Sequence, residues 1–280
     1  KGTLKVTEWL SIENNMEYSS MNYVFPYLAG EGSGVWRNMA DEGFPLAPLT
    51  NPDGTITMSA AYTVGDLYYG KNNMRSHQRV LKDKISVKAD LLDDKSLVLR
   101  ADFTYQNNDE GRRQKRVPVP YSRYEGKYGK VGANREEFTQ RNMLTEYIAT
   151  NVYADYAKTF NDVHHFNFLG GFNYEQSQYK NLTATRNGLV FEDAEDISLA
   201  LGQTQTMTGG FSKWAIAGGF FRVNYNFSDR YLLEVNGRYD GSSKFPSSQQ
   251  WGFFPSASFG WRLSEEKFWK VNPKAISDVK

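Results

Sequence analysis

Hydrophobic and polar residues alternate with a period of two along most of this chain. In one such stretch Leu97, Leu99 and Phe103 fall on one side, whereas Arg100 and Asp102 fall on the other. Because successive side chains of a strand point to opposite faces, this alternation predicts strands with one apolar and one polar face. Eight segments are predicted as strands: Leu4–Tyr18, His77–Leu91, Ser96–Asn108, Arg141–Phe160, His165–Lys180, Ser212–Phe227, Tyr231–Tyr239 and Gly252–Leu263.

The predicted connections are sorted by length. Short turns at 92–95, 161–164 and 228–230 alternate with long polar loops at about 19–76, 109–140 and 181–211 and a shorter loop at 240–251. A soluble sandwich gives no reason for this sorting, whereas a transmembrane β-barrel has short periplasmic turns and long extracellular loops. The fold class expected is therefore all-β, an antiparallel up-and-down transmembrane β-barrel. No amphipathic helix of useful length is predicted.

The membrane interpretation assigns an environment to each strand face. The apolar face is expected to touch lipid and the polar face to line a hydrated lumen. The residues expected on the lumen face are Lys82, Lys84, Lys88, Arg100, Asp102, Asn167, Glu175, Arg222, Glu234 and Arg238.

Aromatic residues are abundant, with 18 Tyr, 18 Phe and 6 Trp. Several stand near predicted strand ends, including Tyr225, Phe227, Tyr231, Trp251 and Trp261. The interfacial girdles of a membrane barrel would fall at these positions. The alternative is that aromatic residues are simply favoured in strands.

Composition excludes several kinds of chemistry. Lys plus Arg is 33 and Asp plus Glu is 32, so the charge balance argues against nucleic acid as a partner. The chain has no cysteine, which excludes disulfides, Cys-ligated zinc and thiol chemistry. No nucleophile–base set and no carboxylate pair stands out, so neither enzymatic activity, a metal nor a cofactor is expected.

Two stretches near the end of the chain form a specific motif. The first runs R-Y-L-L-E-V-N-G-R-Y-D-G-S-S-K-F over 230–245, and the second runs W-G-F-F-P-S-A-S-F-G-W-R-L-S-E-E-K-F over 251–268. Together they resemble a block of the SusC/RagA-type TonB-dependent outer-membrane transporters. Lys244 stands where that family often has Arg. The motif residues, expected to be architectural, are Arg238, Asp240, Gly241, Ser242, Ser243, Lys244, Phe245, Trp251, Gly252, Phe253, Phe254, Pro255, Gly260, Trp261 and Arg262.

The resemblance implies a barrel of about 22 strands with a plugged lumen in the bacterial outer membrane. It further implies import of large nutrients, more often oligosaccharides than peptides, with energy from TonB and with a SusD-like surface lipoprotein as a lid. Outer-membrane lipid and lipopolysaccharide would surround such a barrel. Residues 1–280 are then expected to be part of one barrel domain, without the plug and the remaining strands, since both ends look cut and 276–280 resembles the opening of another strand.

The motif also has a direct physical interpretation. Asp240, followed by Gly241, is a turn signal where a strand leaves the bilayer. Gly252 and Gly260 permit close backbone approach, and Pro255 is awkward within a strand unless the strand is bulged. Arg238 and Asp240 share the inward face, where they are placed to pair.

Other candidates remain open. The basic run Arg112, Arg113, Lys115 and Arg116 is predicted in a solvated loop, with lipopolysaccharide phosphates or an acidic lid protein as the alternative partner. His164 and His165 are adjacent and should face opposite ways, so they are poorly placed to ligate one metal. Residues 30–34 resemble a glycine-rich loop but lack a following Lys-Ser or Lys-Thr, so phosphate binding is not expected.

The first long loop is rich in aromatic residues, which are expected to touch ligand, form a small core or pack on a lid. They are Tyr18, Tyr23, Phe25, Tyr27, Trp36, Phe44, Tyr62, Tyr68 and Tyr69.

Two other classes of protein fit part of the pattern. A complete eight-stranded barrel would be a small passive pore or an adhesion protein. A soluble carbohydrate-binding β-sandwich would bury one face of each sheet against the other.

Overall fold

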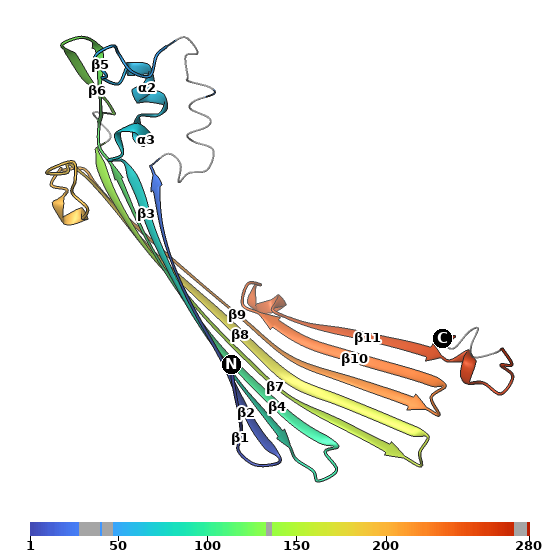
Figure 1. Ribbon diagram of the computed structural model, residues 1–280. Coiled ribbons are helices and arrows are strands. Elements are labelled where there is room, and N and C mark those ends of the chain that lie inside the picture. The colour runs from blue at the N-terminus through green and yellow to red at the C-terminus, as the bar shows by residue number, and fades with distance from the viewer. Residues whose placement is uncertain (28–39, 41–46, 133–135, 272–278) are drawn as a thin grey trace.

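The computed structural model describes residues 1–27, 40, 47–132, 136–271 and 279–280. These residues form one nine-stranded antiparallel sheet, with a two-stranded hairpin and short helices gathered at one end (Figure 1). In spatial order the sheet consists of β1 (Gly2–Lys5), β2 (Leu10–Pro26), β3 (Asn73–Asp90), β4 (Leu97–Arg116), β7 (Glu137–Phe160), β8 (His164–Asn187), β9 (Gln205–Phe227), β10 (Tyr231–Ser242) and β11 (Trp251–Trp261). The hairpin is β5 (Val119–Tyr124) and β6 (Lys127–Val131), and the helices are α2 (Met58–Thr63) and α3 (Gly65–Tyr69). Single 3₁₀ turns are η2 (Ile197–Leu199), η3 (Ser247–Gln249) and η4 (Leu263–Glu265).

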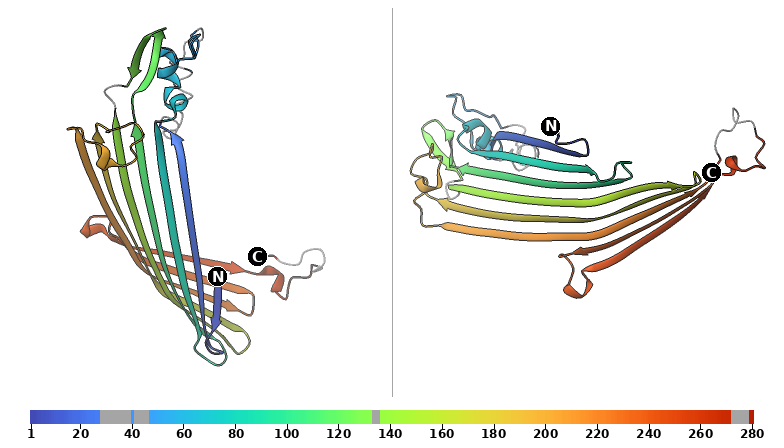
Figure 2. Two further views of the ribbon diagram at one scale, coloured as in Figure 1. Left: turned by 60° about the vertical axis from the view of Figure 1, so that its left-hand side comes forward. Right: turned by 90° about the horizontal axis from the view of Figure 1, so that it is seen from below.

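The sheet is an up-and-down meander that curves along its width (Figure 2). Each strand pairs with its neighbours in chain order, apart from the inserted β5–β6 hairpin, and among the described residues β1 and β11 are the two edges. The fold class is confirmed as a partial antiparallel barrel wall. The alternative of a complete eight-stranded barrel is wrong, because the described sheet is not closed. The alternative of a β-sandwich is also wrong, because all the long described strands belong to a single sheet.

The short turns all lie at one end of the sheet. Asn161 and Asp162 have φ of 50° and 56°, and Ser228 and Asp229 have φ of 53° and 56°. Two successive residues with positive φ define a type I′ turn, whose twist matches that of the flanking strands. Asn and Asp tolerate this conformation better than most residues do, which explains why these tight turns form here.

The prediction of one strand over Leu4–Tyr18 is wrong. The chain turns between β1 and β2, where the backbone N–H of Val6 donates to the Leu10 carbonyl at 2.9 Å. The Thr7 hydroxyl also accepts a hydrogen bond from the Leu10 N–H at 3.0 Å. The alternation of apolar and polar residues continues through this turn, so the sequence pattern conceals it.

At the opposite end, most strands extend further than predicted. The predicted loop at 109–140 begins only at Val117, because β4 continues to Arg116. Beyond Tyr105 the strand reads Gln-Asn-Asn-Asp-Glu, which is polar on both faces and has lost the contrast that marks a half-buried strand. The basic run at 112–116 therefore lies in a strand, which corrects its placement in a loop.

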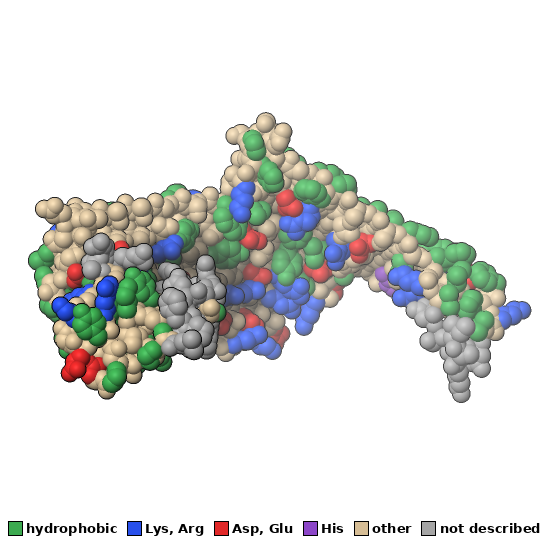
Figure 3. Space-filling model, turned by 90° about the horizontal axis from the view of Figure 1, so that it is seen from above, with side chains coloured by type: hydrophobic (Ala, Val, Ile, Leu, Met, Phe, Trp, Pro, Cys, Tyr) green, Lys and Arg blue, Asp and Glu red, His purple; other side chains and the backbone are tan. Residues whose placement is uncertain are grey.

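The two faces of the sheet differ in chemistry along its full width. In the β-sheet register Leu97 stands opposite Tyr156, Phe168 opposite Val223, and Leu233 opposite Phe259. Their face is exposed rather than buried in a protein core, with Phe168 46% and Leu233 43% accessible. All ten residues predicted on the polar face fall on the other side by the same register. Figure 3 shows charged side chains gathered over the middle of the visible face, with hydrophobic ones along the outer margin.

The buried hydrophobic cluster of the described chain lies at the long-loop end. It consists of Val117, Phe138, Leu189, Ala194 and Ala200. Phe138 comes from the beginning of β7, whereas Leu189, Ala194 and Ala200 come from the connection between β8 and β9. The loops at this end thus fold onto the sheet. In the part of the chain that the structure describes, no helix is both long enough and apolar enough to cross a membrane.

Candidate functional site: a membrane wall and its loop cluster

An aromatic belt lines the apolar face at the short-turn end. Tyr231 stacks on Trp261 with ring centroids 6.4 Å apart and on Phe227 at 6.3 Å. The belt continues onto β8, where the His164 ring lies 5.0 Å from Phe227. Such amphipathic rings suit the interface between lipid and water. The aromatic residues predicted near the strand ends thus form a continuous row at this end of the sheet, and their role as an interfacial girdle stays a prediction.

Glu266 fixes this belt from outside the sheet. Its carboxylate accepts hydrogen bonds from the Tyr231 hydroxyl at 2.8 Å, from the Trp261 indole at 3.1 Å and from Arg230 at 3.4 Å. These bonds, led by that from Tyr231, lower the pKa of Glu266 below its usual value. The residue lies in the motif block but was not predicted as a site residue, because no strand pattern marks a carboxylate that reaches back to a neighbouring hairpin.

A second aromatic pair marks the other border of the apolar face. Tyr239 and Trp251 stack with centroids 5.2 Å apart, and the Trp251 ring covers Gly241, where a Cβ would lie 2.6 Å from it. Tyr231 and Tyr239 are eight residues apart, or about 26 Å along the strand. With the usual tilt this is about 20 Å of membrane thickness, which approaches the apolar band of about 25 Å in such barrels.

On the polar face the motif forms a small hydrogen-bonded cluster. The Arg238 guanidinium donates to both carboxylate oxygens of Asp240, at 3.0 and 2.9 Å, and to the amide oxygen of Asn173 at 3.1 Å. It also lies 5.3 Å from the centre of the Phe220 ring. A Cβ on Gly218 would overlap the Asp240 carboxylate, so the glycine provides the space for this pair. The expected pairing of Arg238 with Asp240 is observed, and Asn173 was missed.

The turn residues of the motif tie β10 to β9. The Ser243 N–H donates to the Ala215 carbonyl at 2.9 Å, and the Ser243 hydroxyl accepts from the Ala215 N–H at 2.8 Å. On the other side of β10, the Ser242 N–H donates to the carbonyl of Gln250, which directly precedes β11, at 3.0 Å. The Lys244 ammonium lies 5.0 Å from the centre of the ring of Trp214 in β9. The Phe245 carbonyl accepts from the Gln250 side chain at 3.2 Å.

Pro255 is accommodated without the expected bulge. It stands opposite Gly237 in an unbroken register. The Ser242 N–H donates to the Gln250 carbonyl, and the Arg262 N–H donates to the Arg230 carbonyl. The backbone hydrogen bonds between β10 and β11 are therefore made by the even-numbered residues of β10, and Gly237 and Pro255 form a non-hydrogen-bonded pair. The nitrogen of Pro255 therefore points away from β10, and no bond to that strand is lost.

The remaining motif residues of β11 divide between the faces. Phe253 joins Trp251 on the apolar face. Phe254 lies on the polar face, where its ring covers Gly252 so closely that a Cβ on this glycine would lie 3.0 Å from it. Gly260 lies close to the Lys280 side chain. All of these contacts are structural, and the architectural role of the motif stays a prediction.

The loops at the far end converge on Asn72, which is 1% exposed. Its side chain accepts from the Val117 N–H at 2.6 Å and donates to the Val117 carbonyl at 2.9 Å. It also donates to the buried Asp66 of α3 at 2.5 Å. Helix α2, which precedes α3 in the chain, is capped by the Thr57 hydroxyl, which accepts from the Ala60 N–H at 3.2 Å. Asn72 thereby joins α3 to the end of β4.

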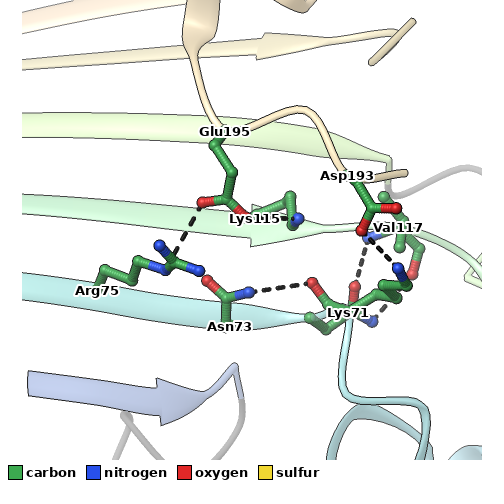
Figure 4. A network of polar contacts seen from close by, with 8 residues as sticks. Lys71, Asn73, Arg75, Lys115, Val117, Asp193 and Glu195 are labelled. Carbon is green, nitrogen blue, oxygen red and sulfur yellow. Dashed lines mark hydrogen bonds and ion pairs between the residues drawn. The ribbon is translucent and has the colours of Figure 1, made fainter. Parts of the chain in front are cut away.

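Acidic residues of the β8–β9 connection hold that loop on β3 and β4 (Figure 4). Asp193 pairs with Lys71 at 2.5 Å, and Glu195 pairs with the buried Lys115 at 2.8 Å and with Arg75 at 3.6 Å. The hydrogen bond from Lys71 lowers the pKa of Asp193. Glu192 accepts from the Tyr69 hydroxyl, and burial together with this bond raises the pKa of Tyr69 to about 12.

The loop cluster, defined as α2, α3, β5, β6 and the 188–204 connection, presents four exposed tyrosines. Tyr62 is 51% exposed, Tyr68 59%, Tyr124 61% and Tyr128 75%. The prediction that Tyr18, Tyr23 and Phe25 belong to this loop is wrong, since all three lie in β2. Trp36, Phe44 and the glycine-rich segment 30–34 lie outside the described residues. Tyr69 packs against the buried cluster.

The basic run and the two histidines alternate between the faces. Arg113 and Lys115 lie on the apolar side of β4, where Lys115 is 3% exposed, whereas Arg112 and Arg116 lie on the polar side. His164 and His165 point to opposite faces, as expected, and bond to Tyr225 and Thr159 respectively. Within the described ranges, no group of three His, Asp or Glu side chains is arranged to hold a metal ion.

A curved meander with one apolar face, bordered by aromatic belts and with short turns at one end, defines the wall of a transmembrane β-barrel. The family model "TonB dependent receptor-like, beta-barrel" matches residues 21–272, and the chain belongs to this family. With the motif block and the relatives below, it is a SusC/RagA-type segment of a bacterial outer-membrane protein.

Curated relatives match parts of the chain. TonB-dependent receptor SusC of Bacteroides thetaiotaomicron is 44% identical over 61 residues, which cover 22% of this chain and 6% of that protein. TonB-dependent receptor P39 of Formosa agariphila is 32% identical over 124 residues, covering 42% of this chain and 12% of that protein. The chain therefore corresponds to a small part of these relatives' length.

A solved structure described as the RagAB peptide transporter superimposes with a TM-score of 0.70 at 18% identity. The match covers 96% of this chain and 30% of that chain. At this level of identity, the likeness concerns the fold.

Proposed function

We propose that the protein containing this chain imports large nutrients across the outer membrane, with oligosaccharides as the preferred cargo. The polar face of the sheet would line the hydrated path and the apolar face would meet lipid. TonB would supply energy through a plug N-terminal to the barrel, and a SusD-like lipoprotein would close the mouth. Further strands would pair with the free edges of β1 and β11, because an unpaired edge in lipid costs several kcal/mol for each bare backbone group.

One observation favours oligosaccharides: the exposed tyrosines Tyr62, Tyr68, Tyr124 and Tyr128 stand on a cluster with its own buried centre. Large rings held on a fixed support bind flat apolar surfaces at a low entropic cost, and the faces of sugar rings are such surfaces. Peptide import is the second candidate, since the RagAB structures carry that description. Their low identity to this chain leaves the cargo to experiment.

The test is uptake by cells that produce the full-length protein. A quadruple Tyr→Ala variant at these four positions should lower uptake of labelled oligosaccharides, and the matched quadruple Tyr→Phe variant should retain it because the rings remain. Deletion of TonB should abolish uptake in either background. Uptake of peptides but not oligosaccharides would contradict the proposed cargo, and TonB-independent uptake would contradict the mechanism.

A further inference from the structure

Two arginines on the polar face stand directly opposite each other. The register of β4 and β7 pairs Arg112 with Arg141. Directly opposite positions of an antiparallel pair hold side chains about 5 Å apart at Cβ, and like charges placed there are destabilising. The two positive charges therefore destabilise the sheet unless a negatively charged group lies near them.

The neighbouring groups compensate this charge only in part. Arg112 has one ion pair, with Glu110 at 3.7 Å. Arg141 donates to the Tyr179 hydroxyl at 3.4 Å and forms no ion pair with any described residue. The Nε atoms of both arginines are shielded from solvent and have no hydrogen-bond partner among the described groups. Each such unpaired donor carries a desolvation cost.

The flanking positions in the same row are hydroxyls. Ser76 of β3 stands opposite Arg112, and Thr183 of β8 stands opposite Arg141. Short side chains therefore stand on both sides of the pair, and the Arg112 side chain is 36% exposed. Tyr105 is the last large apolar side chain on the apolar face of β4, and Arg112 lies seven residues beyond it. The arginine pair therefore lies outside the apolar band of the sheet, toward its long-loop end.

We propose that Arg112 and Arg141 form a subsite for an anionic group, a carboxylate or a sulfate, carried by the imported oligosaccharide. This inference rests on the proposed import function. Guanidinium groups bind such oxyanions with two parallel hydrogen bonds, and two guanidiniums facing one another supply four donors to a single group. The Tyr179 hydroxyl and the hydroxyls of Ser76 and Thr183 are suited to the neighbouring sugar hydroxyls.

The experiment measures binding to the purified full-length protein by calorimetry at low salt. The probes are hexagalacturonate, sulfated maltohexaose and neutral maltohexaose. The double variant R112Q/R141Q should bind at least one of the anionic probes about tenfold more weakly or worse, as expected for lost charge-assisted hydrogen bonds. Its affinity for maltohexaose should be unchanged. Which of the two anionic probes depends on the arginines identifies the group as carboxylate or sulfate.

Two control variants accompany this measurement. R113Q changes the neighbouring residue, which faces the other side of the sheet, and should leave the affinities unchanged. R112K/R141K keeps both charges but loses the paired guanidinium donors, so its affinity for the anionic probe should lie between those of the wild type and R112Q/R141Q. Migration on gels before and after heating verifies that each variant forms a barrel.

Several outcomes would overturn the subsite. They are a wild-type protein that prefers neutral maltohexaose, an equal loss in R113Q, and an acidic hexapeptide bound as tightly as the anionic sugars. Loss of the co-purifying lid protein with unchanged sugar affinity would assign the arginines to that partner instead. Neutral oligosaccharide uptake that continues in R112Q/R141Q cells would leave the proposed import function standing while the subsite fails.

Discussion

At the scale of single residues, position between the aromatic belts sets how costly a charge would be. Val235 lies midway between Tyr231 and Tyr239 on the apolar face. Leu233 is the next residue after Tyr231 on that face and so lies beside the aromatic belt at the short-turn end. A charged side chain on the lipid face costs most at the middle of the bilayer and little near its borders. The register thus predicts which positions of β10 lose most folding free energy when they carry a charge.

We therefore expect Val235→Arg to cost about 2–4 kcal/mol of folding free energy in lipid and Leu233→Arg to cost less. The matched control is Asn236→Arg, which places the same charge on the polar face and should cost little. Equilibrium unfolding of the full-length barrel in lipid vesicles measures all three. Equal losses at 235 and 236 would mean that the faces are assigned wrongly.

A second residue prediction concerns Glu266. Its pKa in the folded protein is lowered from 4.5, chiefly by the hydrogen bond from Tyr231. A carboxyl with a depressed folded pKa stabilises the fold above its unfolded pKa, and this contribution disappears as pH falls through the folded pKa. The melting temperature of the wild-type barrel should therefore fall below about pH 4.5, and Glu266→Gln should flatten that fall.

The readout is the temperature at which the band on a seminative gel shifts, measured from pH 3 to 7. Glu265→Gln is the control, because Glu266 and not Glu265 receives the three side-chain hydrogen bonds described above. An unchanged pH dependence in Glu266→Gln would assign the acid sensitivity to other carboxylates.

At the scale of elements, the sequence predicted the short-turn end of most strands better than the opposite end. The segments ending at Phe160 and Phe227 were predicted to the residue, since alternation stops at the tight turns that follow. At the opposite ends the predicted strands were too short by up to eight residues, as in β4, because hydrated strands lose the apolar contrast. The hydrogen bonds of Asn72, Glu195 and Glu266 join segments far apart in the chain, which no local pattern encodes.

At this scale, we expect the 188–204 connection between β8 and β9 to depend on the packing of Phe138. Phe138 is fully buried beneath it, so Phe138→Ala should remove about 3–5 kcal/mol of packing and loosen that loop. Limited proteolysis of intact cells should then cut within 188–204, while the heat-dependent gel shift of the barrel remains. Phe160→Ala, at a 48% exposed position beside a short turn, should leave the loop resistant. Loss of the whole barrel in Phe138→Ala would contradict the expectation that this loop can loosen while the barrel stays folded.

At the scale of the whole molecule, the sheet is long enough to curve but its edges do not meet. β1 and β11 each have one neighbour among the described strands, and β1 has only four residues. Backbone groups left unpaired in hydrocarbon cost several kcal/mol each, so an isolated open sheet has no stable position in a membrane. In the import protein proposed above, further strands along β1 and β11 would supply this pairing.

It follows that residues 1–280 produced alone in detergent should not give the compact, heat-modifiable band of a closed barrel, whereas the full-length protein should. The curvature set by the meander would have to tighten severely for nine strands to close, and the strands of unequal length leave many unpaired groups at the seam between β1 and β11. Gel migration of unheated and heated samples makes the comparison. A compact band from residues 1–280 would mean that this segment closes on itself, and the import mechanism would then need a different structural basis.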